Sequence, residues 1–361
     1  MTVGSGLAST ASPAPSPSTP PASRLSGGVG YAGVAWSDSR QTGADVDRRG
    51  SWSERGRVGA GGFLDAPFVA PEAEALREAG ATHAVYGIPF DGTTFFRTGS
   101  RHGPHAVRDA SEQFLPYHFD FDVDLAKMLT LVDCGDAAVV PGSAARTLEA
   151  ARRDLAGIHA AGAVPIVLGG EHSVTIAGTS ALAARVDGPL GLVVFDTHLD
   201  TAEDVVGERL TYCSPVSRTL ELPQFSPQNA CLIGIHGPAN PRDEREWAEE
   251  HGVRVYTIKE VEDRGIAAVT EEAMAAAWKG TRGVYVSYDI DCLDAAYAPG
   301  TSGAEPGGLT TRELLAAVRA VASAGYSAFD VVEVAPQYDA AGITATAACR
   351  VILDMLAGAG A

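Results

Sequence analysis

The most regular feature of the sequence is a series of short apolar runs, rich in valine and isoleucine, that begins at residue 83. These runs lack the alternation of apolar and polar positions that is typical of a strand with one exposed face. They therefore predict β-strands buried on both faces, as in a parallel sheet covered by helices. The predicted strands are His83–Ile88, Leu129–Val132, Pro165–Leu168, Gly191–Phe195, Ala230–Ile235, Val253–Ile258, Gly283–Ser287 and Ala328–Val334.

Segments with helical periodicity separate the predicted strands. In one of them, four apolar residues recur at the three- and four-residue spacing that places side chains on one face of an α-helix: Leu148, Ala151, Leu155 and Ile158. Gly162 follows and predicts the end of this helix. Alternating strands and helices predict an α/β fold of three α-β-α layers around a mostly parallel sheet. We expect an open sheet rather than a closed barrel, because no eightfold repeat is evident.

Residues 1–57 differ in composition from the rest of the chain. The stretch from Ser9 to Ser26 is dominated by Ser, Thr, Pro and Ala, and glycine and polar residues follow it. Such a segment offers too few apolar side chains to form a core. We therefore expect a disordered N-terminal extension over residues 1–57 and a single catalytic domain over residues 58–361.

The overall charge narrows the choice of partners. Lys+Arg 27 against Asp+Glu 45 gives 27 − 45 = −18, which argues against nucleic acid or an anionic membrane surface as the partner. A negative field suits divalent cations and a cationic substrate, although an acidic solvated surface has the same composition. Charge therefore leaves the substrate open.

Cysteine usage and the N-terminal sequence bear on the compartment. The five cysteines are an odd number and form no C-x-x-C pair, so they predict neither a disulfide framework nor a thiolate zinc site. No signal-peptide pattern is present and no run approaches 18 apolar residues. We expect a cytoplasmic protein without a membrane anchor.

Histidine and aspartate residues follow the ends of predicted strands, where ligands of open α/β sheets bind. After Leu168 the chain reads Gly169-Gly170-Glu171-His172-Ser173. The two glycines allow a tight turn that places His172 at the start of the next helix. A single histidine in this position is more often a structural residue than a metal ligand.

Two further strand ends carry clusters of ionisable residues. After Phe195, residues two apart in an extended chain would share one face, so we expect Asp196, His198 and Asp200 to point the same way. Asp289 and Asp291 follow the strand that begins at Gly283 and share a face by the same reasoning. Carboxylates this close to one another ionise together only when a cation lies between them.

Together these strand ends predict a centre for two divalent cations. Four aspartates and two histidines without a thiolate favour Mn²⁺ over a structural zinc ion. Two cations roughly 3.5–4 Å apart can lower the pKa of a bound water towards about 7. Such a centre would generate a nucleophile at neutral pH without a catalytic serine or cysteine.

With these motifs the chain resembles the ureohydrolases, the family of arginase and agmatinase, over roughly residues 59–361. The resemblance rests on motifs that occur in the family's order: Gly169-Gly170-Glu171-His172-Ser173, Asp196-Thr197-His198-Leu199-Asp200, Ser287-Tyr288-Asp289-Ile290-Asp291-Cys292-Leu293-Asp294, Glu305-Pro306-Gly307-Gly308-Leu309 and Glu333-Val334-Ala335-Pro336. Upstream, Phe90-Asp91-Gly92-Thr93-Thr94 and the segment from Arg97 to Pro104 are similar to an agmatinase loop. These motifs are specific for the family but not for one substrate.

The resemblance implies a role for each matching residue. One cation would be bound by His172, Asp196, Asp200 and Asp289, and the other by Asp196, His198, Asp289 and Asp291. Asp200 would also transfer a proton to the leaving amine. Glu333 would hold the guanidinium group of the substrate through paired hydrogen bonds. The family further implies two Mn²⁺ per subunit, with Ni²⁺ or Co²⁺ as alternatives, and a homo-oligomer, either a trimer or a hexamer.

The sequence departs from the family pattern at Tyr212, which stands where agmatinases usually have a histidine. A phenol with a pKa near 10 cannot replace that histidine as a base at neutral pH. The leading hypothesis is hydrolysis of a small cationic guanidino compound to urea and an amine, with agmatine itself in doubt. The alternatives are another guanidino or formimino substrate, such as guanidinobutyrate, a secondary-metabolite precursor or free guanidine, and a non-catalytic metal-binding homologue.

Overall fold

Eight parallel strands form the central sheet of the computed structural model, which describes residues 62–359. Their order across the sheet is β4-β1-β5-β10-β9-β6-β7-β8, and every neighbouring pair is parallel. The strands are β1 (His83–Ile88), β4 (Leu131–Asp136), β5 (Val164–Gly169), β6 (Leu190–Phe195), β7 (Phe225–Ile235), β8 (Arg254–Thr257), β9 (Val284–Asp289) and β10 (Ala328–Val332). The predicted extension over residues 1–57 lies outside the described residues.

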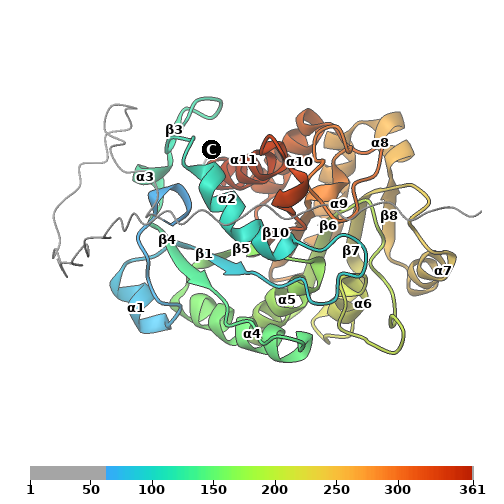
Figure 1. Cartoon of the computed structure of the whole chain (residues 1–361), viewed down its shortest axis with the longest axis horizontal. Coiled ribbons are helices and arrows are strands. Elements are labelled where there is room, and N and C mark those ends of the chain that lie inside the picture. Colours follow the sequence, from blue (N-terminus) through green and yellow to red (C-terminus); the bar gives the residue numbers. More distant parts are fainter. Residues whose placement is uncertain (1–61, 360–361) are drawn as a thin grey trace, which may run out of the picture. The chain divides into compact units, whose positions relative to one another are not determined.

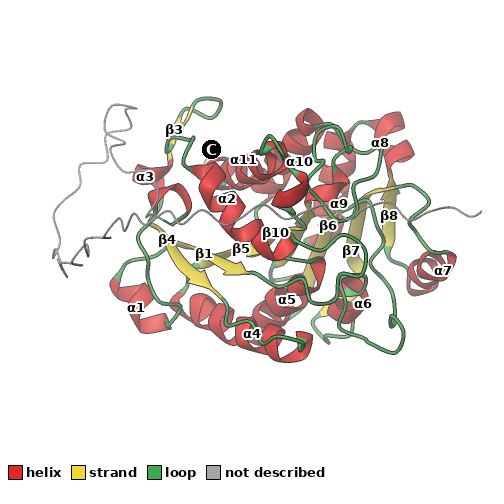
Figure 2. Cartoon of the chain, viewed as in Figure 1, coloured by secondary structure: helices red, strands yellow, loops and turns green. Residues whose placement is uncertain are grey.

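Helices cover both faces of this sheet (Figures 1 and 2). One layer contains α1 (Ala73–Glu78), α4 (Ala144–Ala161), α5 (Thr175–Arg185) and α6 (Pro215–Leu220). The other contains α2 (Gly103–Ser111), α9 (Ile266–Ala277), α10 (Thr311–Ala324) and α11 (Ile343–Gly358). This arrangement confirms the predicted three-layer α/β fold with an open sheet.

Smaller elements lie at the margins of the sheet. Near β8 are α7 (Arg242–His251) and α8 (Ile258–Arg264), and near β4 are α3 (Leu125–Met128) and the antiparallel pair β2 (Tyr117–His118) and β3 (Val123–Asp124). Short 3₁₀ helices are η2 (Phe63–Asp65), η3 (Ser100–His102), η4 (His172–Val174), η5 (Ile290–Cys292) and η6 (Pro336–Tyr338).

The apolar pattern of the sequence accounts for the centre of the sheet. All residues of β6 and β9 are buried, as expected for strands with helices on both faces. In α4, the predicted apolar residues are buried against the sheet, and Gly162 ends the helix with a left-handed φ of 86°.

The prediction was wrong at one edge of the sheet. The strand predicted over Leu129–Val132 lies at Leu131–Asp136, because Leu129 ends α3 and the strand continues into polar residues. Asp133 is nevertheless buried, and the guanidinium of Arg108 binds its carboxylate with Nε 2.8 Å from Oδ2. A rule that looks for apolar runs misses a strand whose buried polar residue is paired in this way.

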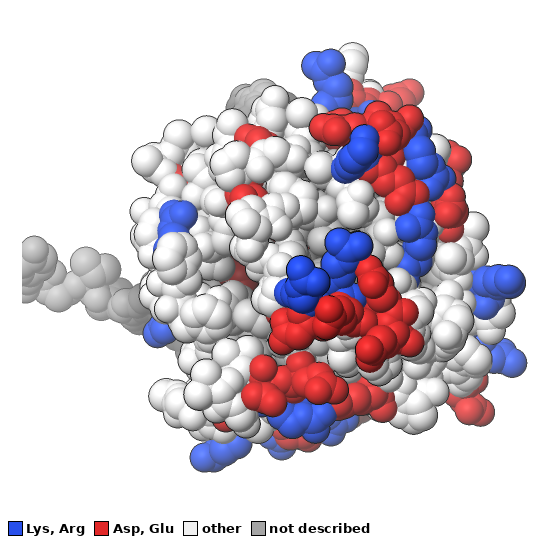
Figure 3. Space-filling model, turned by 90° about the vertical axis from the view of Figure 1, so that its right-hand side faces the viewer, with Lys and Arg blue, Asp and Glu red and all other residues white. Residues whose placement is uncertain are grey.

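The surface charge is largely paired on the face that includes α7 and α8. Figure 3 shows acidic and basic side chains interleaved there. Arg245 pairs with Glu249 at 2.8 Å, and Arg264 pairs with Glu260 at 2.6 Å. Although the full chain has a net charge of −18, this face of the molecule is therefore not uniformly negative.

Two further expectations are tested by the described residues. None of the five cysteines, all of which lie within residues 62–359, forms a disulfide. Among the helices of the same residues, none has both the length and the apolar character needed to cross a membrane.

Candidate metal centre

The four central strands β5, β10, β9 and β6 bring the predicted site residues to one edge of the sheet. His172 follows β5, Glu333 follows β10, and the two aspartate clusters follow β9 and β6. The carboxyl ends of neighbouring parallel strands lie side by side, so residues far apart in the sequence meet here. In the structure all six predicted metal ligands lie close together, and Glu333 lies next to them.

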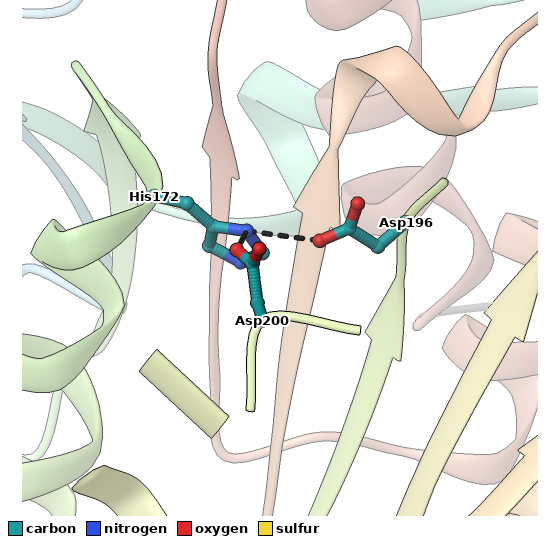
Figure 4. Close-up of side chains that lie close together, drawn as sticks. All are labelled: His172, Asp196 and Asp200. Carbon is teal, nitrogen blue, oxygen red and sulfur yellow. Dashed lines mark ion pairs between the residues drawn. The ribbon is translucent and has the colours of Figure 1, made fainter. Parts of the chain in front are cut away.

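The first group is centred on Nδ1 of His172. This nitrogen lies 3.0 Å from Oδ2 of Asp196, 2.9 Å from Oδ2 of Asp200 and 3.2 Å from Oδ2 of Asp289. Figure 4 shows the carboxylates of Asp196 and Asp200 pointing towards the imidazole from different directions. One ligand atom from each of His172, Asp196 and Asp200 falls within 4.8 Å of the others, a spacing that suits a single cation.

The second group shares Asp196 with the first. Nδ1 of His198 lies 3.2 Å from Oδ2 of Asp291 and 3.5 Å from Oδ1 of Asp196. These three residues also offer ligand atoms within 4.8 Å of one another. A carboxylate that belongs to both groups is the arrangement expected of a bridging ligand between two cations.

The local backbone differs from the extended chain on which the prediction relied. β6 ends at Phe195, and residue Asp200 has a left-handed φ of 52°. Asp196, His198 and Asp200 therefore do not converge by strand alternation, and a looped backbone brings their side chains together. The two glycines before His172 also act differently, since neither has a positive φ. At Gly170 a Cβ would lie 2.0 Å from the carbonyl oxygen of Phe90, so close backbone packing requires the glycine.

Burial and mutual repulsion shift the pKa values of the aspartates. Burial and the neighbouring charge of Asp196 raise the pKa of Asp200 to about 6. Burial, followed by the charges of Asp291 and Asp196, also raises the pKa of Asp289. Burial opposes protonation of His172, but the surrounding carboxylates outweigh it and raise the pKa of the imidazole. The buried aspartates of this cluster therefore carry more negative charge than the two histidines can balance. A bound cation would balance the remainder.

Two buried atoms in this cluster have no hydrogen-bond partner among the described residues, namely Nδ1 of His172 and Oδ2 of Asp196. They lie 3.0 Å apart without the alignment of a hydrogen bond. Buried polar atoms almost always have a hydrogen-bond partner. Two neighbouring atoms without one are therefore suited to bind the same cation. The residues present therefore fit the predicted divalent cations.

A buried chain of hydrogen bonds fixes the imidazole of His172. Its Nε2 lies 2.9 Å from Oγ of Ser287, whose hydroxyl donates to Oδ1 of Asp330 at 2.5 Å. Because that hydroxyl is already used as a donor, Nε2–H of His172 donates to Ser287. The lone pair of neutral His172 is then on Nδ1, which faces the carboxylates and is free to bind a cation.

Glu333 lies directly beside His172, one of the predicted metal ligands. Its Oε1 accepts a hydrogen bond from the backbone amide of His172 at 2.8 Å, and its Oε2 accepts one from Ser302 Oγ at 2.9 Å. Burial and the charge of Glu171 raise the pKa of Glu333 to about 8. A guanidinium ion would supply the positive charge that this carboxylate lacks.

Tyr212 is half-buried and close to the same cluster. Burial raises the pKa of its phenol, and the charges of Cys213, Glu333 and Asp200 raise it further. At neutral pH this side chain is therefore a neutral hydroxyl beside Glu333 and Asp200. The ring also packs edge-on against Phe95, with centroids 5.2 Å apart.

The residues that support the predicted ligands, Glu171, Ser287 and Asp330, had no predicted role. Asp330 does carry a signal in the sequence, since a buried central strand rarely contains a carboxylate. Glu171 is completely buried and accepts hydrogen bonds from the amides of Thr93 and Thr94 at 2.8 and 2.9 Å. The hydrogen bond between Thr93 and Glu171 joins residues that are 78 apart in the sequence, so no local sequence pattern reveals it.

Comparison with known proteins gives a consistent result. The model of the arginase family matches residues 81–358. Proclavaminate amidinohydrolase of Streptomyces clavuligerus is 36% identical over 272 residues, which cover 75% of this chain and 86% of that protein. Guanidinopropionase of Pseudomonas aeruginosa is 35% identical (75% and 85% covered), and agmatinase of Bacillus subtilis is also 35% identical (76% and 90% covered). A solved structure of proclavaminate amidinohydrolase superimposes with a TM-score of 0.74 at 33% identity, covering 83% of this chain and 97% of that one.

Proposed function

The chain belongs to the arginase family, and from this premise we propose that it hydrolyses a guanidino compound to urea and an amine. The enzyme is a hydrolase of linear amidine C–N bonds, as are the relatives named proclavaminate amidinohydrolase, guanidinopropionase and agmatinase. One observation carries the proposal: two groups of histidine and aspartate ligands share Asp196 and lie directly beside the buried carboxylate of Glu333.

We propose that each cation is held by four of these residues. One would be held by His172, Asp196, Asp200 and Asp289, and the other by Asp196, His198, Asp289 and Asp291. The oxygen-rich donor set supports two Mn²⁺ per subunit, with Ni²⁺ or Co²⁺ as the alternatives. When bound, two such ions supply Lewis acidity that makes water a nucleophile near neutral pH.

The protein's own residues would bind the substrate and move the proton. Glu333 holds the guanidinium group with the remaining lone pairs of its two carboxylate oxygens, since within residues 62–359 each oxygen accepts a single hydrogen bond. Asp200 accepts a proton from the attacking water and donates it to the departing amine.

Tyr212 separates this protein from the agmatinase pattern and favours a guanidino substrate other than agmatine. Its neutral phenol cannot exchange a proton with the leaving amine at neutral pH, so that task falls to Asp200. Guanidino acids are such candidates, as the name of the relative guanidinopropionase suggests.

The decisive experiment measures urea release from a panel of guanidino compounds after the protein is loaded with Mn²⁺, Ni²⁺ or Co²⁺. Agmatine, arginine, guanidinopropionate, guanidinobutyrate and guanidine should be compared, with formiminoglutamate assayed by formamide release. The matched control is Asp291→Asn, which keeps the shape of a predicted ligand and removes its charge. We expect at least one guanidino compound to release urea in the native protein and much less in the control. Metal binding without turnover of any compound would instead indicate a non-catalytic homologue.

We propose further that the protein acts in the cytoplasm as a homo-oligomer, a trimer or a hexamer. The absence of disulfides in residues 62–359 is compatible with a reducing compartment. Light scattering coupled to size-exclusion chromatography should give a mass of three or six times 37.3 kDa. A monomer mass would contradict the proposal on assembly.

A further inference from the structure

The loop between β1 and η3 lies close to the metal centre and is held at its base. The backbone amide of Gly99 donates to Oδ2 of Asp91 at 2.6 Å, and Arg101 forms an ion pair with the same buried carboxylate. Next to Gly99, the carbonyl of Thr98 accepts a hydrogen bond from the hydroxyl of Tyr338 at 3.1 Å. Residues 91–99 thus form a closed loop whose ends are fixed.

A second anchor holds the middle of this loop. Both oxygens of Glu171 bind it: Oε2 accepts the amides of Thr93 and Thr94, and Oε1 accepts the Thr93 hydroxyl at 2.5 Å. Glu171 immediately precedes His172, so the anchor is part of the turn that carries a predicted metal ligand. A carboxylate that accepts several hydrogen bonds inside the protein is a strong and specific constraint on its donors.

Thr93 connects this anchor to the loop of Tyr212. Its Oγ1 donates to Glu171 and accepts a hydrogen bond from the backbone amide of Tyr212 at 3.0 Å. Two residues later, the ring of Phe95 packs edge-on against the ring of Tyr212. The Phe95 side chain is nevertheless 68% exposed, which is unusual for a large apolar residue on a loop held this firmly.

We propose that Glu171 is a positioning residue that, through Thr93, holds Phe95 and Tyr212 together as an aromatic wall against which the tail of the substrate packs. The inference rests on the proposed function, because it assumes that Glu333 binds the guanidinium head. The aromatic wall would favour a guanidino compound with an aliphatic or aromatic tail. Free guanidine has no tail that could reach the wall. The exposed ring of Phe95 loses its contact with water when such a tail binds.

The test compares Thr93→Val with Thr93→Ser. Valine has nearly the same shape as threonine but can neither donate to Glu171 nor accept from Tyr212, whereas serine keeps both hydrogen bonds. Phe95→Ala removes one half of the wall, and Phe96→Ala is its matched control, because Phe96 is also exposed, at 75%, and is not part of the proposed wall. Each variant is analysed for Mn²⁺ content, so that an effect on the metal ligands is detected separately.

Two readouts separate the inference from the proposed function. The first, amide hydrogen exchange over residues 91–99, needs no turnover. We expect Thr93→Val to exchange at least about tenfold faster than the native protein, and Thr93→Ser to behave like the native protein. The valine removes the hydroxyl that links Glu171 to the Tyr212 amide, while the amides of residues 93 and 94 still donate to Glu171. Equal exchange in both variants would overturn the positioning role of Glu171 through the Thr93 hydroxyl.

The second readout compares the tail with the head of the substrate. For tailed guanidino substrates, we expect Phe95→Ala and Thr93→Val to raise KM by about tenfold with a smaller change in kcat. The inhibition constant of the guanidinium ion, which has no tail, should stay within about twofold, and Phe96→Ala should change neither. An equal loss for guanidinium and tailed compounds would overturn the aromatic wall. If no guanidino compound releases urea, the proposed function fails, and hydrogen exchange alone then decides the role of Glu171.

Discussion

The hydrogen-bond chain from His172 through Ser287 to Asp330 allows the metal centre to be perturbed without touching a ligand. Ser287→Ala removes the group that accepts from Nε2 of His172 and leaves every predicted ligand in place. The imidazole can then rotate or adopt the other tautomer, with the proton on Nδ1, the atom that should bind the cation. We therefore expect weaker metal binding in a folded protein.

The structure allows an estimate of the size of this effect. Loss of an outer hydrogen-bond partner of a ligating histidine typically lowers metal affinity about 10- to 100-fold. Ser287→Ala also removes one of three donors to Asp330, whose other partners are Thr175 at 2.7 Å and Tyr285 at 2.8 Å. The two remaining donors both bind Oδ2, so Oδ1 of this buried carboxylate has no donor left among the described residues, and we expect about 1–3 kcal/mol of lost stability.

Chelator competition with Mn²⁺, followed by elemental analysis, measures the affinity directly. Tyr285→Phe is the matched control, because it also removes one donor to Asp330, and the Tyr285 hydroxyl forms no hydrogen bond with His172 in the described part of the chain. We expect the control to lose no more stability than Ser287→Ala in denaturant unfolding, because Thr175 still donates to Oδ2, and to keep native metal affinity. Equal metal affinity in Ser287→Ala and Tyr285→Phe would refute the idea that Ser287 orients His172.

Four other changes test the remaining assignments. Asp291→Ala should lose one of two bound ions in elemental analysis, because Asp291 belongs to only one ligand set; unchanged stoichiometry would argue against two cations. Glu333→Gln should keep both ions but weaken guanidinium binding by roughly 10- to 150-fold. This factor corresponds to the loss of about 1.5–3 kcal/mol, which is typical of a hydrogen bond to a charged group. Loss of metal would place Glu333 among the metal ligands. Tyr212→His should shift the substrate preference of the enzyme towards agmatine or arginine. It should also change the pH–rate profile between pH 6 and 10, since a histidine titrates near neutrality. Identical substrate preference and identical pH–rate profiles would show that Tyr212 only packs at the site. Deletion of residues 1–50 should leave kcat/KM within tenfold of the native value, as expected from the composition of that segment.

The centre of the fold could be predicted because its strands are buried on both faces. An apolar run such as Gly191–Phe195 has one simple explanation, and the structure places β6 at Leu190–Phe195. The edge of the sheet was harder, since β4 includes Asp133, which is buried only because Arg108 reaches it from α2. The partner lies 25 residues earlier in the sequence, so no local pattern marks the strand.

The ligands were also easier to predict than their support. His172, Asp196 and Asp291 stand out because histidines and aspartates directly follow apolar strands. Ser287 and Asp330 lie within strands, where their hydrogen bonds to one another depend on the register of β9 against β10. That register pairs Ser287 with Asp330 directly, a fact that only the assembled sheet supplies.

Backbone conformation at the site was the least predictable feature, and it has a physical explanation. Asp200 and Glu333 both adopt left-handed φ values, 52° and 65°, which cost non-glycine residues of order 1–3 kcal/mol each. At Glu333 the cost is met by fixed partners: its amide donates to the carbonyl of Gly170 at 2.8 Å, and its carboxylate accepts from His172 and Ser302. A glycine would adopt this conformation without strain, yet it could not carry the carboxylate that the proposed reaction requires. Strain at Asp200 and Glu333, the two residues proposed to handle the proton and the guanidinium, is therefore best explained by their chemistry rather than by the needs of the fold.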